Sequence, residues 1–177
     1  QSPFKELQTP VFNNARQWLD NLSYQVVFNS PLISIRGCSH AIMQSQSFRQ
    51  ELFQIAFLSC WRVANQKEKE EFSNIIKLII QFEQIDPNVI SLIELVDNVG
   101  MPMMIPDNVI AKACHSSPIS LYYFQRYLRD TCCDEDTILE LLKLNSKMGR
   151  IDSARGLLSS IPNKVKQIDK GKWSIQL

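Results

Sequence analysis

The stretch Glu51-Leu-Phe-Gln-Ile-Ala-Phe-Leu-Ser-Cys-Trp61 decides the fold of this chain. From Phe53 onward, apolar residues recur three and four positions apart, which is the spacing of one face of an α-helix. A second apolar row, formed by Phe48, Leu52 and Ile55, lies on a neighbouring face. Because a helix that is apolar on two sides needs neighbours on both, we expect this one to be an inner helix of a stacked array.

The flanking sequence repeats this helical spacing, with start and stop signals between the apolar segments. Ser30-Pro31 and Asp86-Pro87 each combine an N-cap residue with a proline suited to the first helical turn. Ser47, with Gln50 three residues later, is typical of a capping box, and Gly100 is placed to end a helix in the left-handed conformation. The expected helices cover 10–28, 32–44, 48–65, 67–80 and 87–99, begin again at 107 and at 118, and cover 135–148 and 152–160.

The pattern predicts an all-α chain of about nine helices, without a β-strand periodicity. Connections of roughly two to six residues force successive helices to lie antiparallel, and pairs recur at roughly 30 to 40 residues, the period of helical repeats. In the segment 144–158 a turn at Gly149 is followed by the small residue Ala154, as in a tetratricopeptide (TPR) pair. We therefore predict an α-solenoid of antiparallel helix pairs of the TPR or HEAT type. The predicted structural core includes Trp18, Phe53, Ala56, Phe57, Cys60, Trp61, Leu141 and Ala154.

The two ends of the chain set its expected organisation. Residues 1–9 are interpreted as a linker, and residues 10–177 as one helical-repeat segment. The chain starts without Met and ends on the apolar, helix-like run Trp173-Ser-Ile-Gln-Leu177. We interpret both ends as cuts from a larger polypeptide.

Composition excludes several classes of function. The net charge of +1 gives no overall electrostatic basis for binding nucleic acid. The most apolar run, 75–82, is short and contains Lys77, so no transmembrane segment is predicted, and the N-terminus lacks the pattern of a signal peptide. Five cysteines are an odd number, which favours buried thiols in a reducing compartment over a disulfide framework.

No catalytic, metal or cofactor site is predicted within the chain. The glycines do not have the spacing of a phosphate-binding loop. His40 lies near Cys38 and His115 near Cys114, but a zinc site needs about four ligands at paired spacings. The acidic run 134–136 lacks the ligand pattern of a calcium loop and is interpreted as the cap and first turn of a helix.

Three other features leave alternatives open. Cys132 and Cys133 are either a reactive pair, or one has no chemical role and the other fills the core. Catalysis would need an orienting group that the sequence does not reveal. Lys164, Lys166, Lys170 and Lys172 form a basic stretch that either contacts phosphates or is an exposed connector. The prolines at 102 and 106 exclude a helix there. Met101, Met103 and Met104 are either an adaptable interaction surface or part of a loop packed onto the helices.

The stretch 51–61 resembles the sequence Leu-Phe-Asn-Ala-Ala-Phe-Val-Ser-Cys-Trp in the N-terminal part of the FAT region of target-of-rapamycin (TOR) kinases, within the phosphatidylinositol-3-kinase-related kinase family. Further similarities follow in the family's order from residue 14 to residue 177. They include the segments 18–22, 30–38, 92–97, 113–114, 121–123 and 138–158. The chain departs from the family at Ser117-Pro118, at 124–129 and in the loop at Met101, so contacts made there by relatives are not expected here.

The resemblance implies a non-catalytic scaffold that supports or restrains a kinase domain elsewhere in the parent polypeptide. That parent would be an ATP-dependent Ser/Thr protein kinase in growth and nutrient signalling, with ATP and Mg bound in its kinase domain and none in this segment. The implied partners are the rest of the parent chain and protein subunits of a TOR-like complex. The implied location is cytoplasmic, with the periphery of endomembranes and the nucleus as alternatives.

Two other functions are compatible with the residues. A free-standing TPR-like adaptor would bind partner peptides in a concave groove and would need polar and aromatic side chains on its inner helices, whereas the inner helices here are expected to be apolar on two sides. An enzyme of unrecognised type would use Cys132 or Cys133. The parent reading frame distinguishes the kinase scaffold from the free-standing adaptor. Thiol alkylation tests the enzyme that would use a cysteine.

Overall fold

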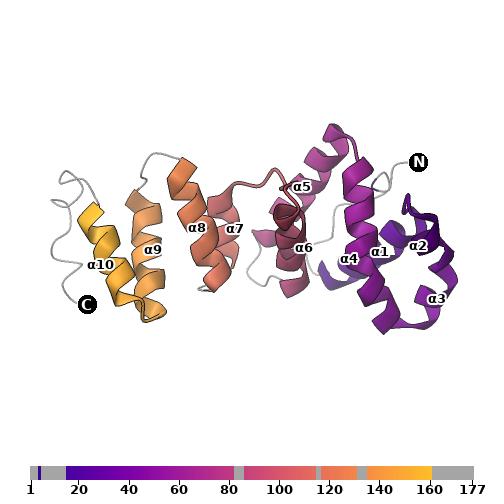
Figure 1. The fold of residues 1–177 in the computed structure, drawn as a ribbon, viewed down its shortest axis with the longest axis horizontal. Coiled ribbons are helices and arrows are strands. Elements are labelled where there is room, and N and C mark those ends of the chain that lie inside the picture. Colours follow the sequence, from indigo (N-terminus) through magenta and orange to yellow (C-terminus); the bar gives the residue numbers. More distant parts are fainter. Residues whose placement is uncertain (1–3, 5–14, 82–85, 115–116, 131–134, 161–177) are drawn as a thin grey trace. The chain divides into compact units, whose positions relative to one another are not determined.

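The computed structural model describes residues 4, 15–81, 86–114, 117–130 and 135–160 (Figure 1). These residues form α-helices and no β-strand, which confirms the all-α class for this part of the chain. They fall into two compact units, residues 1–105 (unit 1) and 106–177 (unit 2). Unit 1 contains α1 (Ala15–Phe28), α2 (Ile33–Gly37), α3 (Ser39–Gln44), α4 (Gln46–Val63), α5 (Gln66–Ile80) and α6 (Pro87–Asn98). Unit 2 contains α7 (Asp107–Ala113), α8 (Pro118–Asp130), α9 (Glu135–Lys147) and α10 (Ile151–Ser160).

Unit 1 is built around α4, which contacts α1, α3 and α6. Phe57, on the predicted inner face of α4, is fully buried. Its ring centroid lies 5.4 Å from that of Phe72 on α5 and 5.9 Å from that of Trp61. We call Phe57, Trp61 and Phe72, with the adjoining rings of Phe4, Trp18 and Phe53, the aromatic cluster. Phe4 is buried in it, although it lies within the range interpreted as a linker.

The second apolar row of α4 is not covered as predicted. Ile55 is 55% exposed, and Phe48 and Leu52 are only half-buried. Periodicity reports which side chains are apolar, whereas burial depends on where neighbouring helices lie. The expectation that α4 is covered on two sides is therefore wrong at Ile55.

The predicted helix over 32–44 is two helices, α2 and α3, which brings the described helices to ten. They meet at Gly37 and Cys38, where the Cys38 N–H donates to the carbonyl of Ile35 in a tight i→i+3 turn. Glycine is a poor helix former, so it permits the break. α2 begins at Ile33, after Leu32, which is later than the predicted Ser30 cap implies. The buried Ser30 hydroxyl still accepts the Leu32 N–H at 3.2 Å, and it also lies 2.9 Å from the Ser59 hydroxyl of α4.

Most of the other helix ends follow the sequence signals. Asp86 caps α6 through the N–H of Asn88, and Gly100 adopts the left-handed conformation with φ +72°. Asn65 and Glu68 form a capping box at the start of α5. The predicted Ser47 cap of α4 is wrong by two residues, since Ser45 accepts the N–H of Phe48 instead.

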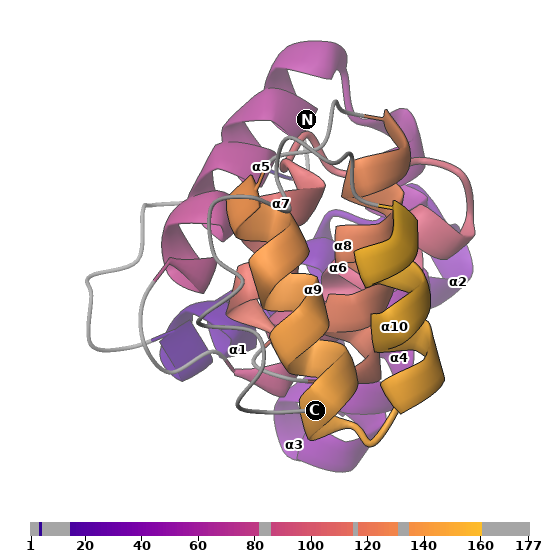
Figure 2. The same ribbon diagram turned by 90° about the vertical axis from the view of Figure 1, so that its left-hand side faces the viewer.

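In unit 2 each helix packs on the next in chain order. α8 contacts both α7 and α9, and α9 contacts α10 (Figure 2). Gly149, with φ +70°, makes the turn between α9 and α10. Ala154 is buried against Ile138 and Leu142 of α9, as its small size suits. This successive pairing is the local arrangement of a helical repeat.

Candidate functional site

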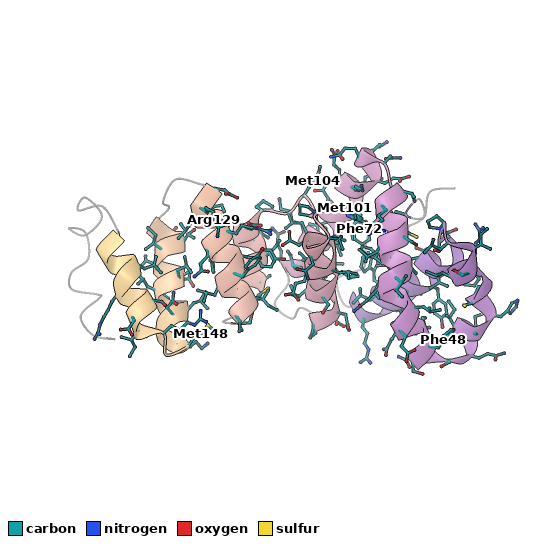
Figure 3. All side chains as sticks on the ribbon, viewed as in Figure 1. Phe48, Phe72, Met101, Met104, Arg129 and Met148 are labelled. Carbon is teal, nitrogen blue, oxygen red and sulfur yellow. The ribbon has the colours of Figure 1, made fainter. Side chains whose placement is uncertain are left out.

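The methionine loop, residues 101–104, is hydrogen-bonded to two helices of unit 1 (Figure 3). The indole N–H of Trp61 donates to the Met101 carbonyl at 3.0 Å. The backbone N–H of Met104 donates to the Ser73 hydroxyl at 3.1 Å. The loop is thus packed onto α4 and α5, and Trp61, a member of the aromatic cluster, holds it directly.

The three methionines occupy different environments within this loop. Met103 is buried, Met101 is half-buried, and Met104 is 49% exposed. The Gln66 amide nitrogen approaches the Met104 sulfur at 3.6 Å. Only Met104 therefore presents a large apolar side chain to solvent, and its flexible thioether suits contact with an apolar partner.

The predicted core residues take two kinds of position. Phe53 is half-buried, with its ring centroid 6.1 Å from that of Phe57. The remaining members are buried; they are Trp18, Ala56, Phe57, Cys60, Trp61, Leu141 and Ala154.

Replacing Trp61 with Phe is expected to loosen the methionine loop while keeping α4 packed. The variant retains an aromatic ring but removes the donor to the Met101 carbonyl, which costs about 0.5–1.5 kcal/mol of unfolding free energy. Amide hydrogen exchange should speed up more within the methionine loop than within α4 itself, at Met101 and Met104, whose N–H groups donate to the Val96 carbonyl and the Ser73 hydroxyl. Ser73→Ala, which removes the acceptor for Met104, should have the same local effect. Unchanged exchange in both variants would contradict this account of how the loop is held.

The candidate metal-binding and nucleophilic side chains do not assemble into a metal or catalytic site in the described part of the chain. There, no three His, Cys, Asp or Glu side chains are grouped to hold a metal ion. His40 is exposed, Cys38 is half-exposed, and the Cys38 thiol donates to the Ser34 carbonyl at 3.3 Å. His115, Cys132, Cys133, Asp134, Lys164, Lys166, Lys170, Lys172 and Trp173 lie outside the described residues.

Cys60 has an inert environment on α4. Its side chain is fully buried, and its thiol donates to the Val26 carbonyl at 3.3 Å. Burial raises the pKa of the Cys60 thiol from 9.0 to about 11, against an opposing hydrogen bond with Ser59. Because the thiolate is the reactive form, Cys60 is a core residue and not a nucleophile at neutral pH.

Alkylation at pH 8 is expected to label Cys60 at least roughly 100-fold more slowly than an ordinary exposed thiol, since two pKa units reduce the thiolate fraction by about that factor. Cys38 and Cys114, which are half-exposed, should label before Cys60, as measured by mass spectrometry of quenched samples. The raised pKa of the Cys60 thiol also makes the free energy of unfolding depend on pH. Its contribution to that free energy is complete below pH 9 and is lost as the pH rises toward 11. Fast labelling of Cys60 in the folded chain would contradict its placement in the core.

Sequence reasoning missed two charged pairs. Arg49 Nη2 donates a hydrogen bond to Asp20 Oδ1 at 3.2 Å. Arg126 donates from Nε and Nη2 to the two carboxylate oxygens of Asp107, each at 2.6 Å. The partners lie 29 and 19 residues apart, so helical spacing cannot reveal them. No sequence signal marks the Arg49 pair; in the structure Tyr24, one turn from Asp20 on α1, stacks on Arg49.

Among the described residues, no helix is both long enough and apolar enough to cross a membrane. No family model matches the chain.

Curated proteins similar to this chain are TOR kinases. Serine/threonine-protein kinase TOR2 of Saccharomyces cerevisiae is 25% identical over 151 residues, which cover 81% of this chain and 6% of the yeast protein. Serine/threonine-protein kinase mTor of Drosophila melanogaster is 25% identical over 167 residues, or 89% of this chain and 7% of the fly protein. Serine/threonine-protein kinase TOR of Oryza sativa subsp. japonica is 22% identical over 170 residues, which cover 89% of this chain and 7% of the rice protein. The chain thus spans only about 6–7% of the length of these relatives.

Proposed function

We propose that this chain is a helical-repeat scaffold segment of a TOR-like Ser/Thr kinase. The proposal starts from the similarity of most of the chain to a short segment of TOR kinases. The predicted resemblance to TOR kinases is confirmed, and its extent over 81–89% of the chain carries the proposal. The finer assignment is the N-terminal part of the FAT region, with residues 10–177 as one helical segment. Its proposed role is to support or restrain the kinase domain and the assembly of the complex.

Exposed apolar side chains support a role in contact with further helices. Ile33 is 77% exposed on α2, Met43 is 60% exposed on α3, and Ile55 is 55% exposed on α4. In a helical repeat each unit is stabilised by covering the apolar face of its neighbour. We propose that the rest of the parent chain and subunits of a TOR-like complex supply those contacts, in the cytoplasm, at endomembranes or in the nucleus.

Catalysis is assigned in this proposal to a kinase domain elsewhere in the parent polypeptide. ATP and Mg would bind there, and no cofactor is proposed for this segment. The alternative is a free-standing TPR-like adaptor for partner proteins. One observation favours it: Arg49, Gln50, Phe53 and Gln54 give α4 a polar and aromatic face, which such an adaptor needs.

The test begins with the parent transcript, read in frame beyond both ends of this sequence. A kinase domain downstream is expected, whereas a stop codon near Leu177 would support the adaptor. The parent protein and a variant lacking residues 15–160 should then be compared for phosphorylation of a general Ser/Thr substrate. A scaffold predicts altered activity or assembly on deletion and no ATP turnover by the isolated chain. A deletion that changes neither would overturn the proposed role.

A further inference from the structure

A pocket of about 290 Å³ opens between α1, α4 and α6, within unit 1. Phe53 and Leu92 contribute apolar surface to it, and Phe53 is half-buried. Gln50 and Gln54, one helical turn apart on α4, place exposed amides on its edge. The volume is near the lower limit of small-ligand pockets and is sufficient for one side chain of a bound peptide.

Arg49 is the cationic group of this pocket. Its side chain is only 8% exposed, and its guanidinium lies 4.1 Å from the centre of the Tyr24 ring. One of its five N–H donors is used, since Nη2 donates to Asp20 Oδ1 at 3.2 Å. Its other N–H groups have no protein acceptor among the described residues. These nitrogens are not among the buried side-chain atoms that lack a partner, so water reaches them, and an acceptor on a ligand entering the pocket can replace that water.

We propose that this pocket binds a carboxylate side chain, Asp or Glu, of a partner peptide. The planar guanidinium can hold a carboxylate through two parallel N–H···O bonds, whereas Asp20 takes only one bond, from Nη2. Among the described residues that line the pocket, Arg49 is the one cation and Asp20 the one anion, so an entering group can carry at most a single negative charge, in competition with Asp20, and a phosphate dianion does not suit the pocket. The amides of Gln50 and Gln54 can hold the main chain of the same peptide. This inference does not depend on the relation to TOR kinases.

Asp20 acts in this proposal as an internal competitor. Its carboxylate is 47% exposed and lies against the cation that the ligand would use. Removing its negative charge frees one donor of Arg49 and removes the repulsion of an entering carboxylate. Asp20→Asn should therefore tighten binding of an acidic peptide, while a cationic ligand would be weakened by the same change.

The test uses the full 177-residue chain and ¹⁵N-detected titrations with capped tripeptides. The Gly-Glu-Gly peptide should shift Arg49 Nε–Hε and the amides of Asn88 and Ser91 saturably, and Gly-Gln-Gly should not. Asp20→Asn is expected to tighten the Glu peptide about two- to fivefold, as loss of one partly exposed charge contact implies. Arg49→Gln should abolish the difference between the two peptides.

Matched variants separate the pocket from general charge effects. Glu71→Gln makes the same charge change as Asp20→Asn on an exposed residue of α5, and Arg62→Gln makes the same change as Arg49→Gln on the exposed face of α4. Neither should alter the titration. Equal shifts by the Glu and Gln peptides would overturn the proposal in the unmodified chain, even if Arg49→Gln failed to fold. Weaker binding by Asp20→Asn, or tighter binding of a Gly-phosphoserine-Gly peptide than of Gly-Glu-Gly, would overturn it as well.

Discussion

Replacing Phe57 with Ala is expected to lower the free energy of unfolding of unit 1 by about 3–5 kcal/mol. The ring is fully buried, and it packs against both Trp61 and Phe72, with centroid distances of 5.9 Å and 5.4 Å. Its removal leaves a cavity that the surrounding rings can fill only in part. Urea unfolding followed by tryptophan fluorescence measures the loss, because Trp61 lies in the same cluster.

Ile55→Ala is the matched control for this experiment. Ile55 lies on the same helix but is 55% exposed, so its truncation should change stability by no more than about 0.5 kcal/mol. A cost below about 1 kcal/mol for Phe57→Ala, or an equal cost for both variants, would mean that α4 buries a different face.

Replacing Leu141 with Ala is expected to destabilise unit 2 by about 2–5 kcal/mol. Leu141 is fully buried on α9, which packs between α8 and α10. Because the chain contains two compact units, a single unfolding curve can mix two transitions. Amide hydrogen exchange in α8 and α9 is therefore the better measurement, and protection should fall there while the amides of α4 are unaffected.

Ile151→Ala provides the control in unit 2. Ile151 begins α10 and is 44% exposed, so its truncation should leave exchange in α9 nearly unchanged. If protection in α9 survived Leu141→Ala, the packing of α9 between its neighbours would be wrong.

The helical class and many helix ends were predictable because their causes are local. Pro87 with the Asp86 cap, and Gly100 in the left-handed conformation, act within one turn of the chain. Two helix starts differ from the prediction. Ser30 accepts the Leu32 N–H, but its hydroxyl also meets Ser59 on another helix, and α2 begins only at Ile33. Ser45 takes the capping position expected of Ser47.

The candidate sites were less predictable. The methionines at 101–104 are visible in the sequence, but their anchoring depends on Trp61 and Ser73, which lie on two different helices. The pocket beside Arg49 needs α1, α4 and α6 together. No sequence pattern joins Asp20 to Arg49 across 29 residues.

The sequence by itself determined that the chain is helical and that α4 buries Phe57 and Trp61, because helix periodicity and capping are properties of neighbouring residues. Only the tertiary structure decided which apolar residues are exposed, how the methionine loop is held and where the Arg49 pocket forms. Those features depend on helices distant in sequence, whose packing sets the burial and hydrogen bonding of each side chain.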